Sequence, residues 1–464
     1  MNITDANWDA HERLSKYNRD FLEYVSKDSR RLMRSNYKAL DTHDPKRVLQ
    51  PWPTFISPQT RDYLKDTSTK LFEIAKSIPK RFFSYDPEKI SRYYSLSRDL
   101  VDYYLYGFSE EHNKDLLARG DFIFSPSGLK CVEYNIGSNL GGGQVPIWES
   151  LYLNTPIIAD FLKQSGARIS NKNLLSVLFD HIISVTRRRL PRLVSREVNV
   201  VIAFGDRAER TANNPREHQY VSQLYQQHLQ QNYSPLKGEI VFSDFKSLKL
   251  QNDFLYYKDM IVHFLLEYNN GGTPFLLRIA QEKGNALIYN GLITDLISNK
   301  LNLALMSENQ DSDIFTPEER EIIKNHTPWS RKVVAGETTY NGQKVNLEEL
   351  MLAQRENLVL KPGDGSGGLD VFLGFKIPQE QWRKVVERAL SQKTWLVQEL
   401  VESLPLLYQC GENGYAEHNV VWGTFVFGKQ YGGTWLRVLP KEHHAGIINI
   451  AQGAEACVTF EVQE

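Results

Sequence analysis

The sequence predicts an α/β protein with α+β elements, and three observations support this prediction. Residues 1–115 carry mostly helical patterns, residues 196–298 alternate between strand and helix patterns, and the chain from residue 357 onward is rich in strands. Alternating strands and helices are typical of an open α/β layer. The 464 residues are enough for two or three domains of about 150 residues.

The composition argues against several classes of partner. The 55 Lys and Arg residues balance the 56 Asp and Glu residues, so no electrostatic reason favours nucleic acid or an acidic membrane. The 3 cysteines lack the spacing of a zinc site or the density of a disulfide scaffold. No stretch approaches the ~18 apolar residues of a membrane helix, and the amino-terminal segment is polar. We expect a cytoplasmic protein with small-molecule substrates and leave open whether it forms a homodimer.

Helical periodicity is clearest in the first segment. Leu64, Leu71, Ile74 and Ile78 fall at three-, four- and seven-residue steps, as on one face of a helix. The aromatic-rich stretch 93–106 is interpreted as core or cover, because aromatic rings usually pack against other apolar groups. We expect residues 1–115 to form a mostly helical region.

The second segment, residues 116–195, begins with two short strand patterns. A Ser-Pro-Ser-Gly turn separates residues 121–124 from residues 129–135, which predicts a hairpin. Glu133 and Asn135 would point to the same strand face and offer oxygen ligands to a divalent cation, although a solvated strand face is the alternative. Cys131 is expected to share that face as a packing residue. A helical region is predicted from residue 147 to about residue 190.

The third segment, residues 196–298, is expected to form a smaller open α/β domain. Strand patterns cover residues 198–204 and 239–242, a helix pattern covers residues 220–229, and residues 259–266 form a further buried run. Ligands of open α/β sheets gather beyond the carboxyl ends of the strands. The polar loop 205–215 is therefore a candidate binding edge.

The fourth segment, residues 299–464, contains a lysine followed by glycines. Lys361 ends the strand pattern 358–361, and the glycine-rich loop 363–368 follows. The lysine precedes the glycines, so this is not a P-loop. Glycines can still bring backbone N–H groups close to phosphate oxygens, and a lysine can neutralise them. The alternative is an ordinary hairpin with residues 371–373.

The order of these motifs resembles the ATP-grasp superfamily. Lys300 opens a helix, Lys361 ends a strand, and the strand pattern 395–401 follows as a hinge. The Glu133-Tyr-Asn135 strand lies upstream of both lysines, as in the circularly permuted arrangement of eukaryotic-type glutathione synthetases and glutathionylspermidine synthase-like ligases. The resemblance covers about residues 115–145 and 285–464.

This resemblance implies a circularly permuted ATP-grasp fold that uses ATP and Mg²⁺. Residues 116–195 would supply a metal and substrate strand, residues 196–298 a substrate-binding domain, and residues 299–464 the nucleotide-binding domain. The implied Mg²⁺ ligands are Glu133, Asn135 and Asp364. The implied ATP contacts are Lys300, Lys361, Gly365, Gly367, Gly368, Val397, Gln398, Glu399, Leu400 and Glu417. The implied substrate contacts are Arg119, Asp121 and Ser138, and the implied catalytic residues are Arg437 and Arg119.

The resemblance also implies a reaction, an ATP-dependent ligation of a carboxylate and an amine. The reaction would pass through an acyl phosphate, release ADP, and act on an amino acid or small peptide. The run 263–268 lacks an arginine that glutathione synthetases use to grip their dipeptide, which argues against γ-glutamylcysteine as substrate. Glutathione synthetase proper, a non-catalytic ATP- or metabolite-binding protein and an ATP-grasp phosphotransferase stay open as alternatives.

Overall fold

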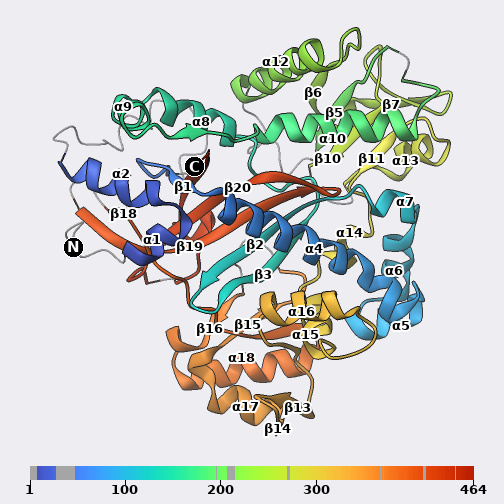
Figure 1. The fold of residues 1–464 in the computed structure, drawn as a ribbon. Coiled ribbons are helices and arrows are strands. Elements are labelled where there is room, and N and C mark those ends of the chain that lie inside the picture. Colours follow the sequence, from blue (N-terminus) through green and yellow to red (C-terminus); the bar gives the residue numbers. More distant parts are fainter. Residues whose placement is uncertain are drawn as a thin grey trace.

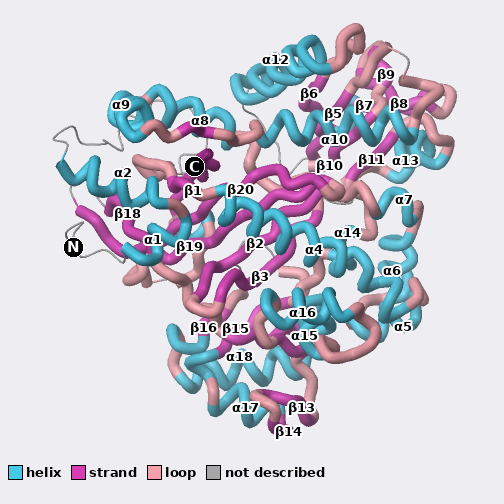
Figure 2. The backbone as a smooth tube through the Cα atoms, in the orientation of Figure 1, coloured by secondary structure: helices cyan, strands magenta, loops and turns pink. Residues whose placement is uncertain are grey.

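The computed structural model shows a mixed α/β fold with several sheets (Figure 1). It describes residues 8–27, 48–194, 196–205, 215–268, 272–365, 368, 370–410, 414–444 and 446–463. Strands gather in the middle of the molecule, with helices around them (Figure 2). None of the described helices combines the length and apolar character that a membrane crossing requires.

An eight-stranded sheet forms the centre and joins the two ends of the chain. Its strands run in the order β1, β21, β20, β19, β2, β3, while β18 pairs with β19 and β4 pairs with β21. Their bounds are β1 Thr54–Ile56, β2 Leu117–Ser125, β3 Gly128–Ile136, β4 Arg168–Ile169, β18 Leu406–Cys410, β19 Gly414–Phe427, β20 Gln430–Pro440 and β21 Glu455–Gln463. The predicted hairpin is confirmed as β2 and β3, and β2 pairs antiparallel with β19.

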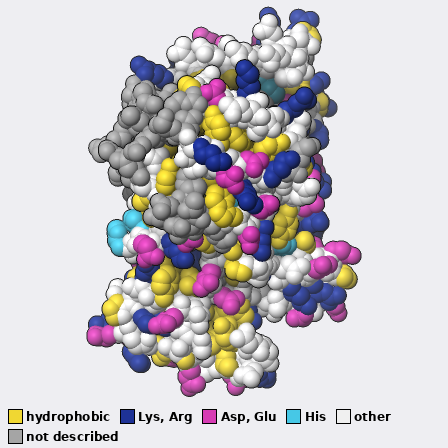
Figure 3. All heavy atoms as spheres, turned by 60° about the vertical axis from the view of Figure 1, so that its left-hand side comes forward, with side chains coloured by type: hydrophobic (Ala, Val, Ile, Leu, Met, Phe, Trp, Pro, Cys, Tyr) yellow, Lys and Arg dark blue, Asp and Glu magenta, His cyan; other side chains and the backbone are white. Residues whose placement is uncertain are grey.

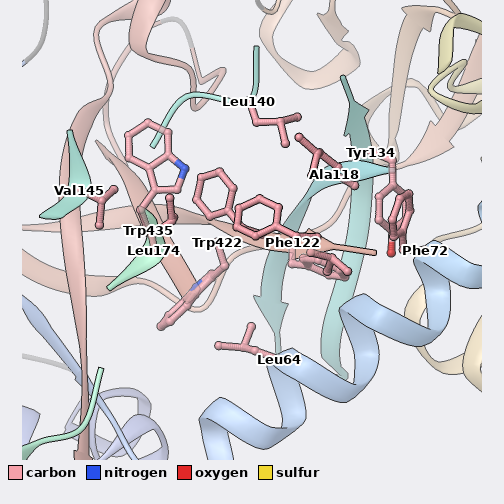
Figure 4. Close-up of a cluster of buried hydrophobic side chains, with 14 of the residues drawn as sticks. Leu64, Phe72, Ala118, Phe122, Tyr134, Leu140, Val145, Leu174, Trp422 and Trp435 are labelled. Atoms are coloured by element: carbon pink, nitrogen blue, oxygen red, sulfur yellow. The ribbon is translucent and has the colours of Figure 1, made fainter. Parts of the chain in front are cut away.

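A long helix, α4 (Pro58–Phe83), covers one face of this sheet (Figure 4). Its buried Leu64 and Phe72 face the sheet residues Phe122 and Tyr134, and the Phe72 and Tyr134 rings stack with centroids 6.2 Å apart. Ser57 caps the helix by accepting a hydrogen bond from the Thr60 backbone N–H. The apolar periodicity of this segment therefore marks the face that packs on the sheet.

The other helices of the first 195 residues are shorter than the sequence patterns indicated. They are α1 Trp8–Leu14, α2 Lys16–Lys27, α5 Pro87–Tyr94, α6 Arg98–Leu105, α7 Glu110–Asn113, α8 Val145–Asn154, α9 Pro156–Ser165 and α10 Leu174–Arg189. The helical region predicted from residue 147 to 190 is thus three helices with β4 between the last two. Pro156 starts α9, and Gly166 ends it at φ 71° in the left-handed region, where glycine is favoured.

A separate four-stranded parallel sheet lies in the order β11, β10, β5, β6. Its strands are β5 Val200–Phe204, β6 Ile240–Asp244, β10 Phe264–Glu267 and β11 Leu287–Tyr289, with helices α12 Pro215–Asn232 and α13 Phe275–Glu282. A small meander, β7 Leu248–Gln251, β8 Phe254–Tyr257 and β9 Met260–Ile261, accompanies it. Most of the loop predicted as a binding edge, residues 206–214, lies outside the described residues.

A second four-stranded sheet, entirely antiparallel, lies in the order β12, β17, β15, β16. Its strands are β12 Ser330–Lys332, β15 Leu358–Pro362, β16 Phe372–Leu373 and β17 Trp395–Glu399. Around it lie α17 Leu347–Ala353, α18 Gln379–Gln392 and the hairpin β13 Glu337–Tyr340 and β14 Gln343–Asn346. Helices α14 Thr294–Ile297, α15 Leu301–Glu308 and α16 Pro317–His326 precede it in the chain. Because β15 pairs with β16, the hairpin considered from sequence is present.

The central sheet cuts across the predicted segment boundaries. It contains strands from residues 54–56, from residues 117–136 and from residues 406–463. The segment 299–464 is therefore divided. Strands β12, β15, β16 and β17 form the smaller antiparallel sheet, β13 and β14 pair as a separate hairpin, and β18 to β21 belong to the central sheet. The division into four domains stays a prediction.

Charged side chains of both signs intermingle on the face that Figure 3 shows. This mixture agrees with the near balance of 55 basic and 56 acidic residues in the sequence. A basic surface of the kind that tracks a nucleic-acid backbone is not visible on that face.

Candidate functional site

A cleft of about 830 Å³ lies between the central sheet and the four-stranded antiparallel sheet. One wall carries Asp121 and Glu133 from the β2–β3 hairpin and Arg437 from β20. The opposite wall carries Lys361 from β15 and Gln398 from β17. The fold thus brings the Glu-x-Asn strand and the lysine strand, more than 200 residues apart in sequence, to one cleft.

A β-bulge at Val132 decides which side chains of β3 reach the cleft. Asp121 pairs with Glu133, but the next residue of β2, Phe122, pairs with Cys131, so Val132 is the extra residue. The alternation of faces shifts by one position across a bulge. Glu133 is therefore half-buried at the cleft, whereas Cys131 is fully buried in the core on the other face. The expectation that Cys131 shares the face of Glu133 was wrong for this reason.

Lys300 lies directly before α15 and connects the Glu-x-Asn strand to the glycine-rich loop. Its Nζ lies 3.0 Å from Glu133 Oε1 and also donates a hydrogen bond to the carbonyl of Gly365. The Lys300 backbone N–H donates to Gly363 O at 2.8 Å. Gly365 and Gly368 both line the cleft, so Lys300 fixes one end of this loop beside Glu133.

Lys361 is buried at the base of the cleft among neutral acceptors. Its Nζ donates to the carbonyl of the bulge residue Val132 at 2.8 Å and to Gln398 Oε1 at 2.8 Å. Burial lowers the pKa of Lys361 to about 8, although the nearby Glu133 carboxylate acts in the opposite direction. At neutral pH the side chain is therefore a buried cation with no carboxylate directly bonded to it.

Asp121 is the centre of a buried polar cluster on the sheet wall. Its carboxylate lies 2.9 Å from Arg119 Nε and 2.7 Å from Arg437 Nη2, and it accepts a hydrogen bond from Asn135 Nδ2 at 2.9 Å. Burial alone would raise the pKa of Asp121, but the two guanidinium groups outweigh it and lower this pKa to about 2. The Arg119–Asp121 ion pair is buried, and Arg437 shares its carboxylate.

Arg437 lines the cleft from β20, although most of its side chain is buried. It is 6% exposed, and its Nε and Nη2 have no hydrogen-bond partner, so the contact with Asp121 is ionic. Burial lowers the pKa of Arg437, yet an arginine stays charged at physiological pH. Two guanidinium groups share one carboxylate here, which leaves a net positive charge that an anionic ligand would balance.

Gly423 makes room for this cluster on the neighbouring strand. A Cβ at Gly423 would lie 2.7 Å from Trp435 Nε1 and 3.1 Å from Arg119 Cδ. The Trp435 ring in turn lies 5.9 Å from the guanidinium carbons of both Arg119 and Arg437. The missing side chain at residue 423 therefore lets the indole and Arg119 lie flat against the sheet.

The predicted hinge is brought only partly to the cleft. Gln398, Glu399 and Leu400 line it, but the backbone N–H groups of Glu399 and Leu400 donate to Trp329 O and Asn357 O. Val397 lies between β12 and β15, and its side chain is buried in the core beneath the sheet. The structure does not bring Val397 to the cleft.

Five other predicted residues do not line the cleft: Arg119, Asn135, Ser138, Asp364 and Glu417. Ser138 donates to Tyr289 O at 2.9 Å, and Glu417 lies 3.5 Å from Lys441 Nζ on a more distant part of β19. Asp364 is exposed to solvent, unlike Glu133 and Asn135. Gly367 lies outside the described residues, so the structure says nothing of it.

The oxygen atoms at Glu133 and Asn135 suit a magnesium ion that also binds phosphate. The Glu133 carboxylate lines the cleft. Asn135 does not line it, but its Nδ2 donates to the cleft residue Asp121, so its Oδ1 stays available as an acceptor. Mg²⁺ bound with a nucleotide needs only one or two protein carboxylates. Within the described ranges, no group of three or more His, Cys, Asp and Glu residues forms a complete metal site. The residues therefore fit a metal–nucleotide complex and not a protein-only metal site.

Apolar side chains form the remaining walls of the cleft, where they would suit a planar base. They come from both sheets and the loops beside them: Ile123, Val359, Val371, Leu373, Leu404, Val421 and Ile447. Sequence reasoning missed the cleft residues Asn419 and Val421, which precede Gly423 at two-residue steps. Their spacing on a single strand is the signal that would have placed them on the face of Gly423.

Comparisons with known proteins give little further information. No family model matches the chain, and no curated protein matches it. A crystal structure of a protein from Methylobacillus flagellatus, described as a candidate gamma-glutamylcysteine synthetase, has a TM-score of 0.42 and 10% sequence identity. The similarity covers 85% of this chain and 88% of that chain, but it is too low to carry an argument about fold or activity.

Proposed function

We propose that this protein is an ATP-dependent carboxylate–amine ligase with a circularly permuted ATP-grasp arrangement. The observation that carries the proposal is the convergence of Lys300, Lys361 and Glu133 in one cleft between the central sheet and the smaller antiparallel sheet. Because the charge of Lys300 contributes to the lowered pKa of Lys361, a polyphosphate bound beside both lysines would offset this repulsion.

The distribution of charge also supports two anions in the same cleft. Lys300 and Lys361 lie toward the glycine-rich loop, and Arg119 and Arg437 lie around Asp121. Two separate cationic groups are what a ligase of this kind requires, because it must hold a nucleotide phosphate and a substrate carboxylate together.

In this proposal the bound Mg·ATP transfers its γ-phosphoryl group to the substrate carboxylate, and an amine then attacks the acyl phosphate, releasing ADP and phosphate. Lys300 and Lys361 bind the phosphates, and Glu133 and Asn135 provide the metal ligands. Arg437, which lines the cleft, holds the carboxylate or the transferring phosphoryl group. Arg119 and Asp121 keep that guanidinium in place. Catalysis by charge stabilisation needs no protein nucleophile.

Phosphate release from ATP with Mg²⁺ and a panel of amino acids and small peptides tests the proposal. A true substrate pair should stimulate release of phosphate and ADP, and a substrate labelled with ¹⁸O in its carboxylate should transfer that label to the released phosphate. Silence across a broad panel, from protein that is folded, would contradict the proposal.

The same assay separates the alternatives. Turnover restricted to γ-glutamylcysteine and glycine would identify glutathione synthetase proper. A product that retains phosphate would indicate a phosphotransferase. ATP binding without turnover would indicate a protein that senses ATP or a metabolite.

A further inference from the structure

A buried chain of hydrogen bonds leads from Lys361 away from the cleft. Lys361 Nζ donates to Gln398 Oε1 at 2.8 Å, and Gln398 Nε2 donates to Ser330 Oγ at 3.0 Å. The Ser330 hydroxyl donates to the carbonyl of Pro328 at 2.9 Å. Lys361, Gln398 and Ser330 are 7%, 2% and 0% exposed, so water does not compete for these bonds.

Lys361 and Ser330, the two partners of the Gln398 side chain, fix the orientation of its amide group. Lysine can only donate, so the amide oxygen must face Lys361. The Ser330 hydrogen is used by Pro328, so the serine oxygen accepts from the amide nitrogen. A rotation of the amide by 180° would oppose donor to donor at Lys361 and would leave buried polar groups unsatisfied.

The same chain reaches the element that carries Lys300. The Ser330 backbone N–H donates to Ser307 Oγ at 3.0 Å, and Arg331 Nη1 donates to the same oxygen at 3.0 Å. Ser307 lies near the end of α15, the helix that begins directly after Lys300. One buried network therefore connects the two elements from which both lysines reach the cleft.

The hydrogen-bond acceptors around Lys361 are neutral, so its positive charge remains available to bind a phosphate. The ammonium group has three N–H donors, of which Val132 O and Gln398 Oε1 occupy two. A carboxylate in place of Gln398 would form an ion pair and neutralise the charge that a phosphate needs. A glutamine holds the lysine in place without this neutralisation.

We propose that Gln398 and Ser330 are positioning residues that orient Lys361 toward a nucleotide phosphate while leaving its positive charge uncompensated. This inference rests on the proposed function, and it assigns the Gln398 side chain to Lys361 where the resemblance implied a nucleotide contact. Ser330 has no place in the resemblance at all, and it acts only through Gln398.

Titration calorimetry with the non-hydrolysable ATP analogue AMP-PNP and Mg²⁺, between pH 6.5 and 9.5, tests the inference. Wild-type affinity should fall as the pH rises through about 8, where Lys361 loses its proton. Gln398→Leu should weaken binding at pH 7 about tenfold, because a buried hydrogen bond to a charged group is lost. Ser330→Ala should weaken binding less, by roughly threefold, because the amide keeps its contact with Lys361 but loses its fixed orientation.

Gln398→Glu provides the readout that a merely structural role would not change. The carboxylate raises the pKa of Lys361, so the pH midpoint of binding should move upward while affinity at pH 7 falls. The nucleotide's own titration is common to all variants and cancels. Thr339→Ala, an exposed position on β13 whose side chain is not in the network, is the matched control and should bind as wild type does.

The outcomes separate the inference from the function on which it rests. The inference is supported if the pH midpoint of binding is higher in Gln398→Glu than in the wild type and if Ser330→Ala binds AMP-PNP more weakly. Normal binding and an unchanged midpoint in both variants overturn the inference alone, provided that Lys361→Met abolishes binding. A wild-type protein that binds no AMP-PNP overturns the proposed function and the inference together.

Discussion

At the scale of single residues, Asp121 organises the sheet wall of the cleft. Its carboxylate forms ion pairs with Arg119 and Arg437 and accepts a hydrogen bond from Asn135, and the residue is 3% exposed. A buried charge is tolerated when it is paired and hydrogen-bonded. The depressed pKa of Asp121 shows that the pairing outweighs burial.

We predict that Asp121→Asn destabilises the protein by roughly 3–5 kcal/mol, because two buried guanidinium groups lose their counter-charge. Urea denaturation of the ligand-free protein measures this change. Asp121→Asn combined with Arg437→Met should recover part of the loss. A single substitution that costs less than about 1 kcal/mol would contradict the buried pairing.

Glu133 gives a second prediction at this scale, concerning metal. Chelation of Mg²⁺ should weaken nucleotide binding to the wild type about tenfold or more, because metal and carboxylate together neutralise the phosphates. Glu133→Gln should bind weakly with or without Mg²⁺, as measured by calorimetry. Glu321→Gln, on the exposed side of α16, is the control and should keep the wild-type dependence. An unchanged Mg²⁺ dependence in Glu133→Gln would exclude this residue as a ligand.

At the scale of elements, β3 and β19 each carry one irregular feature that shapes the cleft. The bulge at Val132 separates the core face of β3 from its cleft face and presents a carbonyl to Lys361. Gly423 has no side chain, which leaves room on β19 for Trp435 and Arg119. Both features lie on the part of their strand that borders the cleft, so they shape the site directly.

We predict that Gly423→Ala destabilises the protein by about 1–3 kcal/mol, the usual effect of overpacking. The new methyl group would push on Trp435 and Arg119, so the proposed ligase activity should fall as well. Combining Gly423→Ala with Trp435→Phe should cost less than the two single changes added together, since the smaller ring relieves the contact. If the losses in unfolding free energy of the two single variants simply add in the double variant, as measured by urea denaturation, the new methyl group does not contact Trp435.

At the scale of the whole molecule, buried histidines connect stability to pH. Burial lowers the pKa of His11 and of His112 to about 4. His112 Nε2 lies 2.7 Å from the Asn290 carbonyl, in a position to donate as the neutral ring. Each histidine is therefore neutral in the folded protein at pH values where an unfolded histidine, with a pKa of about 6.5, takes up a proton.

The sign of this effect follows from proton binding. Below pH ~6.5 the unfolded chain binds protons that the folded protein does not, so stability is full above that pH and falls as the pH drops toward ~4. His112 alone should account for about 2 kcal/mol of this loss by pH 5. Urea denaturation at pH 7.5, 6 and 5 should show it, and His112→Gln should flatten the dependence. His444→Gln, at an exposed site, should leave it unchanged.

Local patterns were enough to predict several elements correctly. The β2–β3 hairpin was predicted because its turn and alternating residues are neighbours in sequence, and α4 because its apolar residues repeat along one helix. The face of Cys131 was predicted wrongly, since a bulge leaves no local mark in residues 129–135. Val397 was assigned to the nucleotide by resemblance, whereas its place in the middle of β17 depends on which strands lie on either side.

The sequence by itself determined which residues carry charge and which segments form strands, because both depend on side-chain type and spacing. Only the tertiary structure decided that Lys300 and Glu133 form a pair, that Asp121 serves two arginines, and that Gln398 accepts a hydrogen bond from Lys361. Such contacts arise where two sheets built from distant parts of the chain face each other, and their partners follow from strand order and register, which local spacing does not encode.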